Sequence, residues 1–183
     1  MSQSPRRRVA VVGATGVAGQ QFLVSLDRHP WFEVVALAAS SRSAGKPYRE
    51  AITDDRGHAK WGCEEPLPEV FGEQRVVDAE TLDLSQVDLV FSAVESGAAR
   101  ALEARMAPLV PVVSTSSAFR YEHDVPILVP GVNDGMTTVV GRLREDAVLP
   151  NGIKFVLLSH NTKLGAAKGA LLVAEHLVHQ GLA

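Results

Sequence analysis

The stretch that decides the expected fold is VAVVGATGVAG, residues 9–19. It begins with small and β-branched apolar residues without polar alternation, which predicts a strand buried on both faces. Three glycines follow at the spacing G-x-x-G-x-x-G, and the apolar spacing of residues 20–26 then predicts the start of a helix. A strand, a tight glycine turn and a helix in this order favour an α/β protein with a doubly wound parallel sheet, Rossmann-like in type.

The glycine turn also predicts a ligand. It points free backbone N–H groups and the positive end of the helix dipole at one spot, which suits a pyrophosphate. Glycine is needed there because a side chain would block the close approach of the phosphates, or of the helix to the strand. We interpret the motif as a dinucleotide-binding turn; the alternative is an ordinary turn of another α/β protein. The cofactor-binding residues expected here are Gly13, Thr15, Gly16, Val17, Ala18 and Gly19.

The loop after the second predicted strand indicates which dinucleotide is bound. That strand covers residues 33–39, and an NAD enzyme usually carries an Asp or Glu just after it for the ribose 2′-hydroxyl. Residues 40–46 instead offer hydroxyl groups, an arginine and a lysine. Arg42 can form a bidentate pair with a 2′-phosphate, so the sequence favours NADP over NAD; a polar surface loop is the alternative. The expected contacts are Ser40, Ser41, Arg42 and Ser43.

The next stretch, residues 48–76, has no clear period and is rich in Gly, Pro, Asp and Glu. This composition predicts a long surface excursion with one short strand at residues 75–77.

Further βα units follow. Residues 87–94 and 111–115 are predicted strands, and the alanine-rich residues 97–106 are a predicted helix between them. Because ligands bind outside the carboxyl ends of such strands, we expect Ser92 and Ala93 to face the cofactor. The alternative is that small residues simply end the strand.

The last part of the chain has a different pattern. Residues 137–143 and 153–159 are predicted strands that form an antiparallel pair, with a turn signal at residues 150–152. Residues 164–180 are a predicted helix with one small-residue face and one apolar face.

Composition narrows the class of protein. A chain of 183 residues suits one domain of ordinary size, and a net charge of −3 gives no sign of a nucleic-acid partner. The single cysteine excludes a disulfide framework and favours the cytoplasm. No apolar run reaches the length of a membrane span, and Gly13 interrupts any signal-peptide core, so no membrane partner is expected.

With these features in place, the chain resembles the aspartate-semialdehyde dehydrogenases, in their archaeal and fungal-like branch. The resemblance rests on several pieces that occur in the order of the family and cover nearly the whole chain. They are GATGVAG (13–19), ASSRSAGK (39–46), FSAV (91–94), SSAFR (116–120), DVP (124–126), VPGVN (129–133), VGRLR (140–144), LSHNT (158–162) and GAA (165–167).

The resemblance implies the reaction of that family, the reduction of aspartyl phosphate by NADPH to aspartate semialdehyde, in the pathway to lysine, threonine and methionine. A cysteine thiolate attacks the acyl phosphate, hydride then reaches the thioester, and a histidine acts as acid and base. The resemblance places Arg120 at the substrate phosphate and Asn161 near the nicotinamide.

The chain also departs from the family, whose members are roughly twice as long and exceed one ordinary domain. In the family the piece like residues 129–133 leads into an Asn-Cys-Ser/Thr motif that carries the nucleophile. Here residues 133–136 run directly into a segment that resembles a near-C-terminal strand. Most of the catalytic and dimerisation domain is therefore expected to be missing, and no catalytic residue is assigned. We expect a Rossmann domain at residues 1–135, and remnant strands plus a C-terminal helix that packs back on it at residues 136–183.

The remaining cysteine and histidines do not replace the missing groups. Cys63 stands beside two carboxylates, whose charge should raise its pKa and disfavour the thiolate. His160 is expected near the site without being catalytic. His176 and His179 are two ligands where zinc needs more, so we expect both to be solvated and no metal to be bound.

Three hypotheses follow. The leading one is an NADP-binding domain that is inactive alone in the reaction of the family. The second is a shortened NADPH-dependent reductase that works with a partner chain, and the third is a cofactor-sensing module. Because residues 137–158 would lack their neighbouring strands, they are expected to expose an apolar surface and an unpaired edge, which predicts a homodimer.

Overall fold

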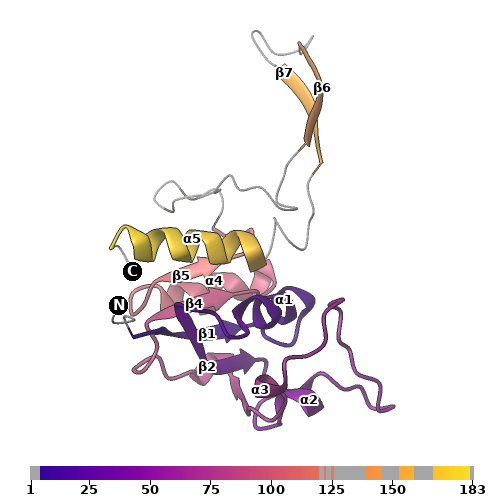
Figure 1. The fold of residues 1–183 in the computed structure, drawn as a ribbon, viewed down its shortest axis with the longest axis vertical. Coiled ribbons are helices and arrows are strands. Elements are labelled where there is room, and N and C mark those ends of the chain that lie inside the picture. Colours follow the sequence, from indigo (N-terminus) through magenta and orange to yellow (C-terminus); the bar gives the residue numbers. More distant parts are fainter. Residues whose placement is uncertain are drawn as a thin grey trace.

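A computed structural model describes residues 5–119, 122, 125, 139–145, 153–158 and 167–181, with the backbone alone for residues 139–145 and 153–158. A parallel five-stranded sheet in the order β3-β2-β1-β4-β5 forms its centre (Figure 1). Its strands are β1 (Arg7–Val12), β2 (Phe32–Ala39), β3 (Val76–Asp78), β4 (Leu89–Ser92) and β5 (Val112–Ser114). The doubly wound sheet expected from the sequence is confirmed.

The helices lie between the strands, and one follows the last strand. They are α1 (Val17–Leu26), α2 (Tyr48–Ala51), α3 (Glu69–Gly72), the 3-10 helix η1 (Ala79–Thr81), α4 (Ser96–Met106) and α5 (Lys168–His179). The strands β6 (Val139–Glu145) and β7 (Ile153–Leu158) form a separate antiparallel pair, as expected, with a register shift between Gly141 and Arg144. No helix in the described part of the chain has the length and apolar character needed to cross a membrane.

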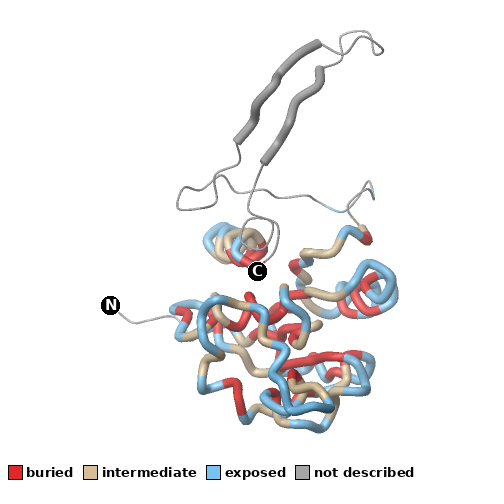
Figure 2. Tube along the Cα trace, turned by 90° about the vertical axis from the view of Figure 1, so that its right-hand side faces the viewer, coloured by how far each residue is buried: buried red, intermediate tan, exposed pale blue. Residues whose placement is uncertain are grey.

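Side chains of β1 alternate between two hydrophobic cores, one on each face of the sheet. Val9 and Val11 pack with α1 and α5, whereas Ala10 and Val12 pack with α4. All four are fully buried, which is why the run lacks polar alternation. Figure 2 shows the buried residues gathered in the interior and the exposed residues on the outside of this part of the molecule.

The first core is built from aromatic rings and small residues. The rings of Phe22 and Phe32 lie against Phe91, with centroid distances of 5.0 and 5.6 Å. On α5 the buried positions are mostly alanines, and the helix packs against α1 and β5. Small side chains allow this close approach, so α5 lies beside α1 on one face of the sheet.

Two expectations need correction. Helix α1 begins at Val17 and not at Gln20, because Gly16 is an extended N-cap (φ −79°, ψ 160°) whose carbonyl accepts the Gln20 N–H at 2.8 Å. The interpretation of residues 48–76 as a surface excursion is wrong in part, because this segment contains α2 and α3 and buries Tyr48 and Phe71. Burying a large aromatic ring is favourable enough to fix an otherwise irregular segment on the core.

Candidate cofactor-binding site

The glycine loop joins β1 to α1 at the carboxyl edge of the sheet. The N–H groups of Gly13 and Ala14 both donate to the carbonyl oxygen of Ala38, at 2.8 and 3.0 Å. The N–H of Gly16 donates to the Gly13 oxygen at 3.1 Å and closes a tight turn. The loop is thus attached to the end of β2 as well as to its own strand.

Two of the three glycines have no room for a side chain. Gly13 has a φ of +81°, and a Cβ there would lie 2.7 Å from the carbonyl oxygen of Ala93. A Cβ on Gly19 would overlap the Gly13 carbonyl oxygen. A Cβ on Gly16 would remain 3.5 Å from the nearest atom, so this position is set by its role as N-cap rather than by crowding.

The start of α1 presents unsatisfied N–H groups. Helix geometry leaves the first-turn donors without partners inside the helix. No hydrogen bond to another residue in the described ranges uses the N–H groups of Val17 and Ala18. Gly16 and Val17 are exposed, and the first turn carries no acidic side chain. This combination suits an anionic group, because the helix dipole adds to the free donors.

The loop of residues 40–46 lies at the same edge, since β2 is the parallel neighbour of β1. Its far end is fixed by the Gly45 N–H, which donates to Val76 O at 2.8 Å, and by the Arg75 guanidinium, which donates to Gly45 O at 2.6 Å. Arg42 is exposed and makes no hydrogen bond or ion pair with any residue that the structure describes. Ser40 and Ser41 are exposed as well, and Ser43 is half-buried.

The end of β4 forms the third side of the site. Ala93 is half-buried, and its carbonyl oxygen faces Gly13. Ser92 is fully buried, and its hydroxyl donates to the Glu103 carboxylate at 2.6 Å. The Ser114 hydroxyl donates to the same oxygen at 2.6 Å. The hydroxyl of Ser92 therefore joins β4 to α4 and β5, and a contact of Ser92 with the cofactor stays a prediction.

Two buried side chains that the sequence analysis did not identify hold the glycine loop. The Tyr48 hydroxyl donates to Ala14 O at 2.7 Å, and the Gln20 side-chain amide donates to Thr15 O at 3.0 Å. Gln20 had a detectable signal, since it is an amide on the buried side of a helix. Tyr48 had none, because it stands in a segment without periodicity.

The other candidate residues from the sequence are Arg120, Asn161, His160 and Cys63. Arg120, Asn161 and His160 lie outside the described residues. Cys63 is half-buried, and its thiol pKa is raised, first by burial and then by the charge of Glu65. The expected direction is right, although burial is the larger cause.

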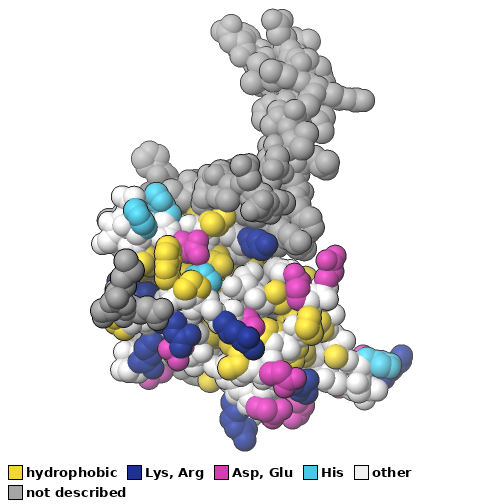
Figure 3. All heavy atoms as spheres, viewed as in Figure 1, with side chains coloured by type: hydrophobic (Ala, Val, Ile, Leu, Met, Phe, Trp, Pro, Cys, Tyr) yellow, Lys and Arg dark blue, Asp and Glu magenta, His cyan; other side chains and the backbone are white. Residues whose placement is uncertain are grey.

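The two histidines of α5 are exposed to solvent, as the sequence predicts. His176 and His179 are exposed, and histidine side chains lie on the surface over this helix (Figure 3). Within the described residues, no group of three His, Cys, Asp or Glu side chains is placed to hold a metal ion.

Comparison with known proteins gives one family. A model for the NAD-binding domain of semialdehyde dehydrogenases matches residues 8–138. The chain is 44% identical over 125 residues to the aspartate-semialdehyde dehydrogenase of Methanothermobacter thermautotrophicus, covering 68% of this chain and 34% of that protein. It is 39% identical over 152 residues to the enzyme of Candida albicans, covering 81% of this chain and 39% of that protein.

Solved structures of aspartate-semialdehyde dehydrogenases also match the chain. The crystal structure of aspartate-semialdehyde dehydrogenase with NADP from Candida albicans matches with a TM-score of 0.61 and 37% identity, over 68% of this chain and 34% of that one. The structure of aspartate-semialdehyde dehydrogenase II from Vibrio cholerae matches with a TM-score of 0.52 and 29% identity, over 69% of this chain and 36% of that one. The chain thus spans little more than a third of the length of these relatives.

Proposed function

Because the chain belongs to the semialdehyde dehydrogenase family through its NAD-binding domain, we propose that it binds NADP(H) at the carboxyl edge of the sheet. The pyrophosphate lies on the glycine loop and the start of α1, and the adenosine 2′-phosphate lies against Arg42. The observation that carries the proposal is the exposed guanidinium of Arg42, which has no partner among the described residues and lies one strand away from the loop.

The chemistry of this edge supports NADP over NAD. A cation in the loop after β2 attracts a phosphate dianion, whereas an NAD site usually places a carboxylate there for the ribose hydroxyls. The exposed hydroxyl groups of Ser40 and Ser41 add neutral donors next to Arg42. The Candida albicans relative is a structure with NADP, which favours the same cofactor here.

Calorimetric titration of the chain with NADPH and NADH tests this proposal. The parent chain should bind NADPH more tightly than NADH, and Arg42→Ala should raise the Kd for NADPH by roughly 10- to 100-fold, the worth of a charge-assisted pair. Arg42→Ala should leave the Kd for NADH within about twofold. Arg56→Ala is the matched control, because it removes an exposed arginine that lies outside the residue 40–46 loop.

Two results contradict the proposal. If the parent chain does not bind NADPH, the proposed cofactor site does not exist. Equal NADPH binding by the parent chain and Arg42→Ala would show that the 2′-phosphate lies elsewhere.

We also propose that the chain does not by itself reduce aspartyl phosphate, the reaction that the resemblance implies for the family. Cys63 is the only cysteine in the sequence, and its raised pKa disfavours the thiolate that such chemistry needs. NADPH oxidation with aspartyl phosphate should stay at the level of buffer alone. Turnover that Cys63→Ser abolishes would contradict this.

A homodimer through residues 137–158 and a cytoplasmic location complete the proposal. Support for the dimer comes from β6 and β7, which pair with each other and with no other described strand. Support for the location comes from the single cysteine. Sedimentation at high micromolar concentration should show a dimer, and a monomer there would contradict the assembly.

A further inference from the structure

Two carbonyl groups of the glycine loop are held by side chains from outside it. Ala14 O accepts the Tyr48 hydroxyl at 2.7 Å, and Thr15 O accepts the Gln20 amide at 3.0 Å. Tyr48 is fully buried and Gln20 is 1% exposed. Both side chains therefore lie on the inner side of the loop, and each donates to a residue between its first two glycines.

The direction of these carbonyls fixes the direction of the N–H groups that follow them. In a trans peptide the C=O of one residue and the N–H of the next point in opposite directions. Because Ala14 C=O points inward to Tyr48, the Thr15 N–H points away from the interior. Because Thr15 C=O points to Gln20, the Gly16 N–H is free to reach Gly13 O and close the turn at 3.1 Å.

Gln20 also attaches a second segment to this loop. Its amide donates to Lys60 O at 2.7 Å, and its carbonyl oxygen accepts the Gly62 N–H at 2.7 Å. Residues 60–62 thereby lie against the start of α1, where a Cβ on Gly62 would come 3.0 Å from the Val17 side chain. One glutamine thus joins the loop, the helix and the segment that precedes Cys63.

Tyr48 connects the loop to the other half of the site. It begins α2, one residue beyond the loop of residues 40–46, and its N–H donates to Gln74 O at 2.9 Å. Burial, with a contribution from the charge of Cys63, raises the pKa of Tyr48 far above its ordinary value. The hydroxyl therefore stays protonated and remains a donor across the physiological pH range.

We propose that Tyr48 and Gln20 are positioning residues of the nucleotide site, which hold the glycine loop with the Thr15 N–H directed at the pyrophosphate. Tyr48 further joins this loop to the loop that carries Arg42. The inference rests on the proposed function and deepens it, because it names residues that set the geometry of the phosphate cradle without contacting the cofactor.

The inference predicts a selective loss. Ligands with a 5′-phosphate use the glycine loop, whereas adenosine 2′-monophosphate has no 5′-phosphate and depends on the residue 40–46 loop. Tyr48→Phe removes one hydroxyl oxygen and should raise the Kd for NADP by about three- to tenfold, the worth of one neutral hydrogen bond. The Kd for adenosine 2′-monophosphate, measured by competition against NADPH fluorescence, should stay within about twofold.

Gln20→Leu should give the same pattern with a larger rise in the Kd for NADP, because it removes three hydrogen bonds. The leucine side chain has a volume similar to that of glutamine. Gln21→Leu is the matched control. It makes the same change one residue along α1, and the Gln21 side chain makes no hydrogen bond with the glycine loop in the described structure. Tyr48→Phe decides the question even if Gln20→Leu fails to fold, because it keeps the buried ring.

The possible results distinguish failure of the positioning role from failure of the proposed function. If the parent chain binds NADP and Tyr48→Phe binds it equally tightly, the positioning role is wrong and the proposed function stands. If Tyr48→Phe weakens both ligands in parallel, Tyr48 supports the whole fold and the selective role is wrong. If the parent chain binds neither ligand, the proposed function fails and this inference fails with it.

Discussion

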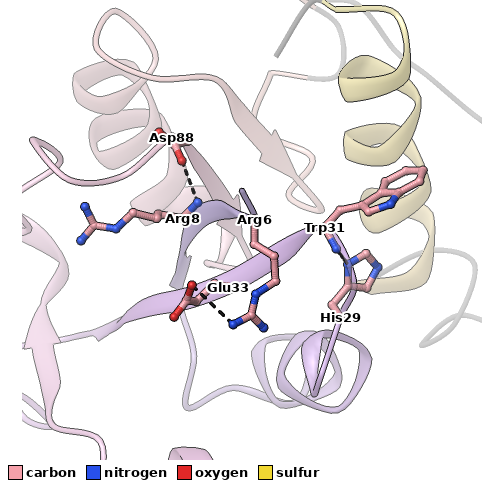
Figure 4. A network of polar contacts seen from close by, with 6 residues as sticks. All are labelled: Arg6, Arg8, His29, Trp31, Glu33 and Asp88. Carbon is pink, nitrogen blue, oxygen red and sulfur yellow. Dashed lines mark hydrogen bonds and ion pairs between the residues drawn. The ribbon is translucent and has the colours of Figure 1, made fainter. Parts of the chain in front are cut away.

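The two edges of the central sheet carry similar residue types and use them differently. At the amino edge, the Arg6 guanidinium lies 3.6 Å from Glu33, and the Arg8 N–H donates to the Asp88 carboxylate at 2.7 Å (Figure 4). At the carboxyl edge, Arg42 meets no acidic partner among the described residues. Arg6 at the amino edge forms an ion pair within the chain, whereas Arg42 at the carboxyl edge is left for solvent or a ligand.

The amino edge is also fixed to the last helix. The Trp31 N–H donates to His29 Nδ1 at 3.2 Å, and His29 Nε2 lies at hydrogen-bond distance, 3.0 Å, from a carboxylate oxygen of Glu175 on α5. His29 is 9% exposed and stacks on Phe32 at a centroid distance of 4.9 Å. The contacts of this edge are therefore structural, and the proposed cofactor site lies at the other edge.

The largest expected effect comes from Gly13→Ala at the carboxyl edge. A left-handed φ for alanine, together with contact with Ala93 O, should cost about 3 kcal/mol of folding free energy and weaken NADPH binding at least tenfold. Urea unfolding and calorimetry measure both. Gly57→Ala is the control: Gly57 has a φ of +82°, and a Cβ there would have no atom within 4 Å, so only about 1 kcal/mol should be lost, with binding unchanged. Equal binding losses in the two variants would contradict the account.

Glu175→Ala, at the amino edge, should have the next largest effect. It leaves the nearly buried His29 N–H without its acceptor, which should cost about 1–2 kcal/mol of unfolding free energy. NADPH binding should not change, because this contact lies away from the glycine loop. Glu175→Gln keeps an acceptor oxygen and should stay close to the parent in thermal unfolding. A loss of cofactor affinity in Glu175→Ala would show that the two edges are coupled.

The pH dependence of Cys63 gives a smaller effect. Its pKa is raised in the folded chain, so iodoacetamide should react several-fold more slowly at pH 8 than with the same chain unfolded in urea. Since the folded state favours the neutral thiol, the stability that this group contributes is present below the pKa of the unfolded chain and is lost as pH rises through the folded pKa. Faster alkylation of the folded chain would indicate an activated thiol at the carboxyl edge.

The smallest effect is expected from Arg6→Ala. The Arg6–Glu33 pair is about half exposed on both sides, so its removal should change the unfolding free energy by less than about 0.5 kcal/mol. NADPH binding should not change, in contrast to Arg42→Ala. A Kd that rises in both arginine variants would point to a general charge effect of the chain rather than to one edge.

The sequence predicted the parts of the molecule that local pattern determines. The strand β1 and the glycine turn lie in short runs whose spacing and composition predict them. The role of Arg42 rests on the composition of its loop and stays a prediction. Tyr48 could not be assigned in this way, because its partner Ala14 lies 34 residues away along the chain. Gln20 carried a local signal, but its contact with Lys60, 40 residues away, could not be predicted. Such contacts form only when β2 has placed both segments at one edge.

The central claim is that the carboxyl edge, and not the amino edge, binds the cofactor. The most direct test is to follow the amide resonances of the isotope-labelled chain by NMR during titration with NADPH. We expect shifts at Thr15, Gly16 and Arg42 that saturate together, and none at Arg8 or Trp31. Shifts confined to the amino edge, or spread equally over both edges, would contradict it.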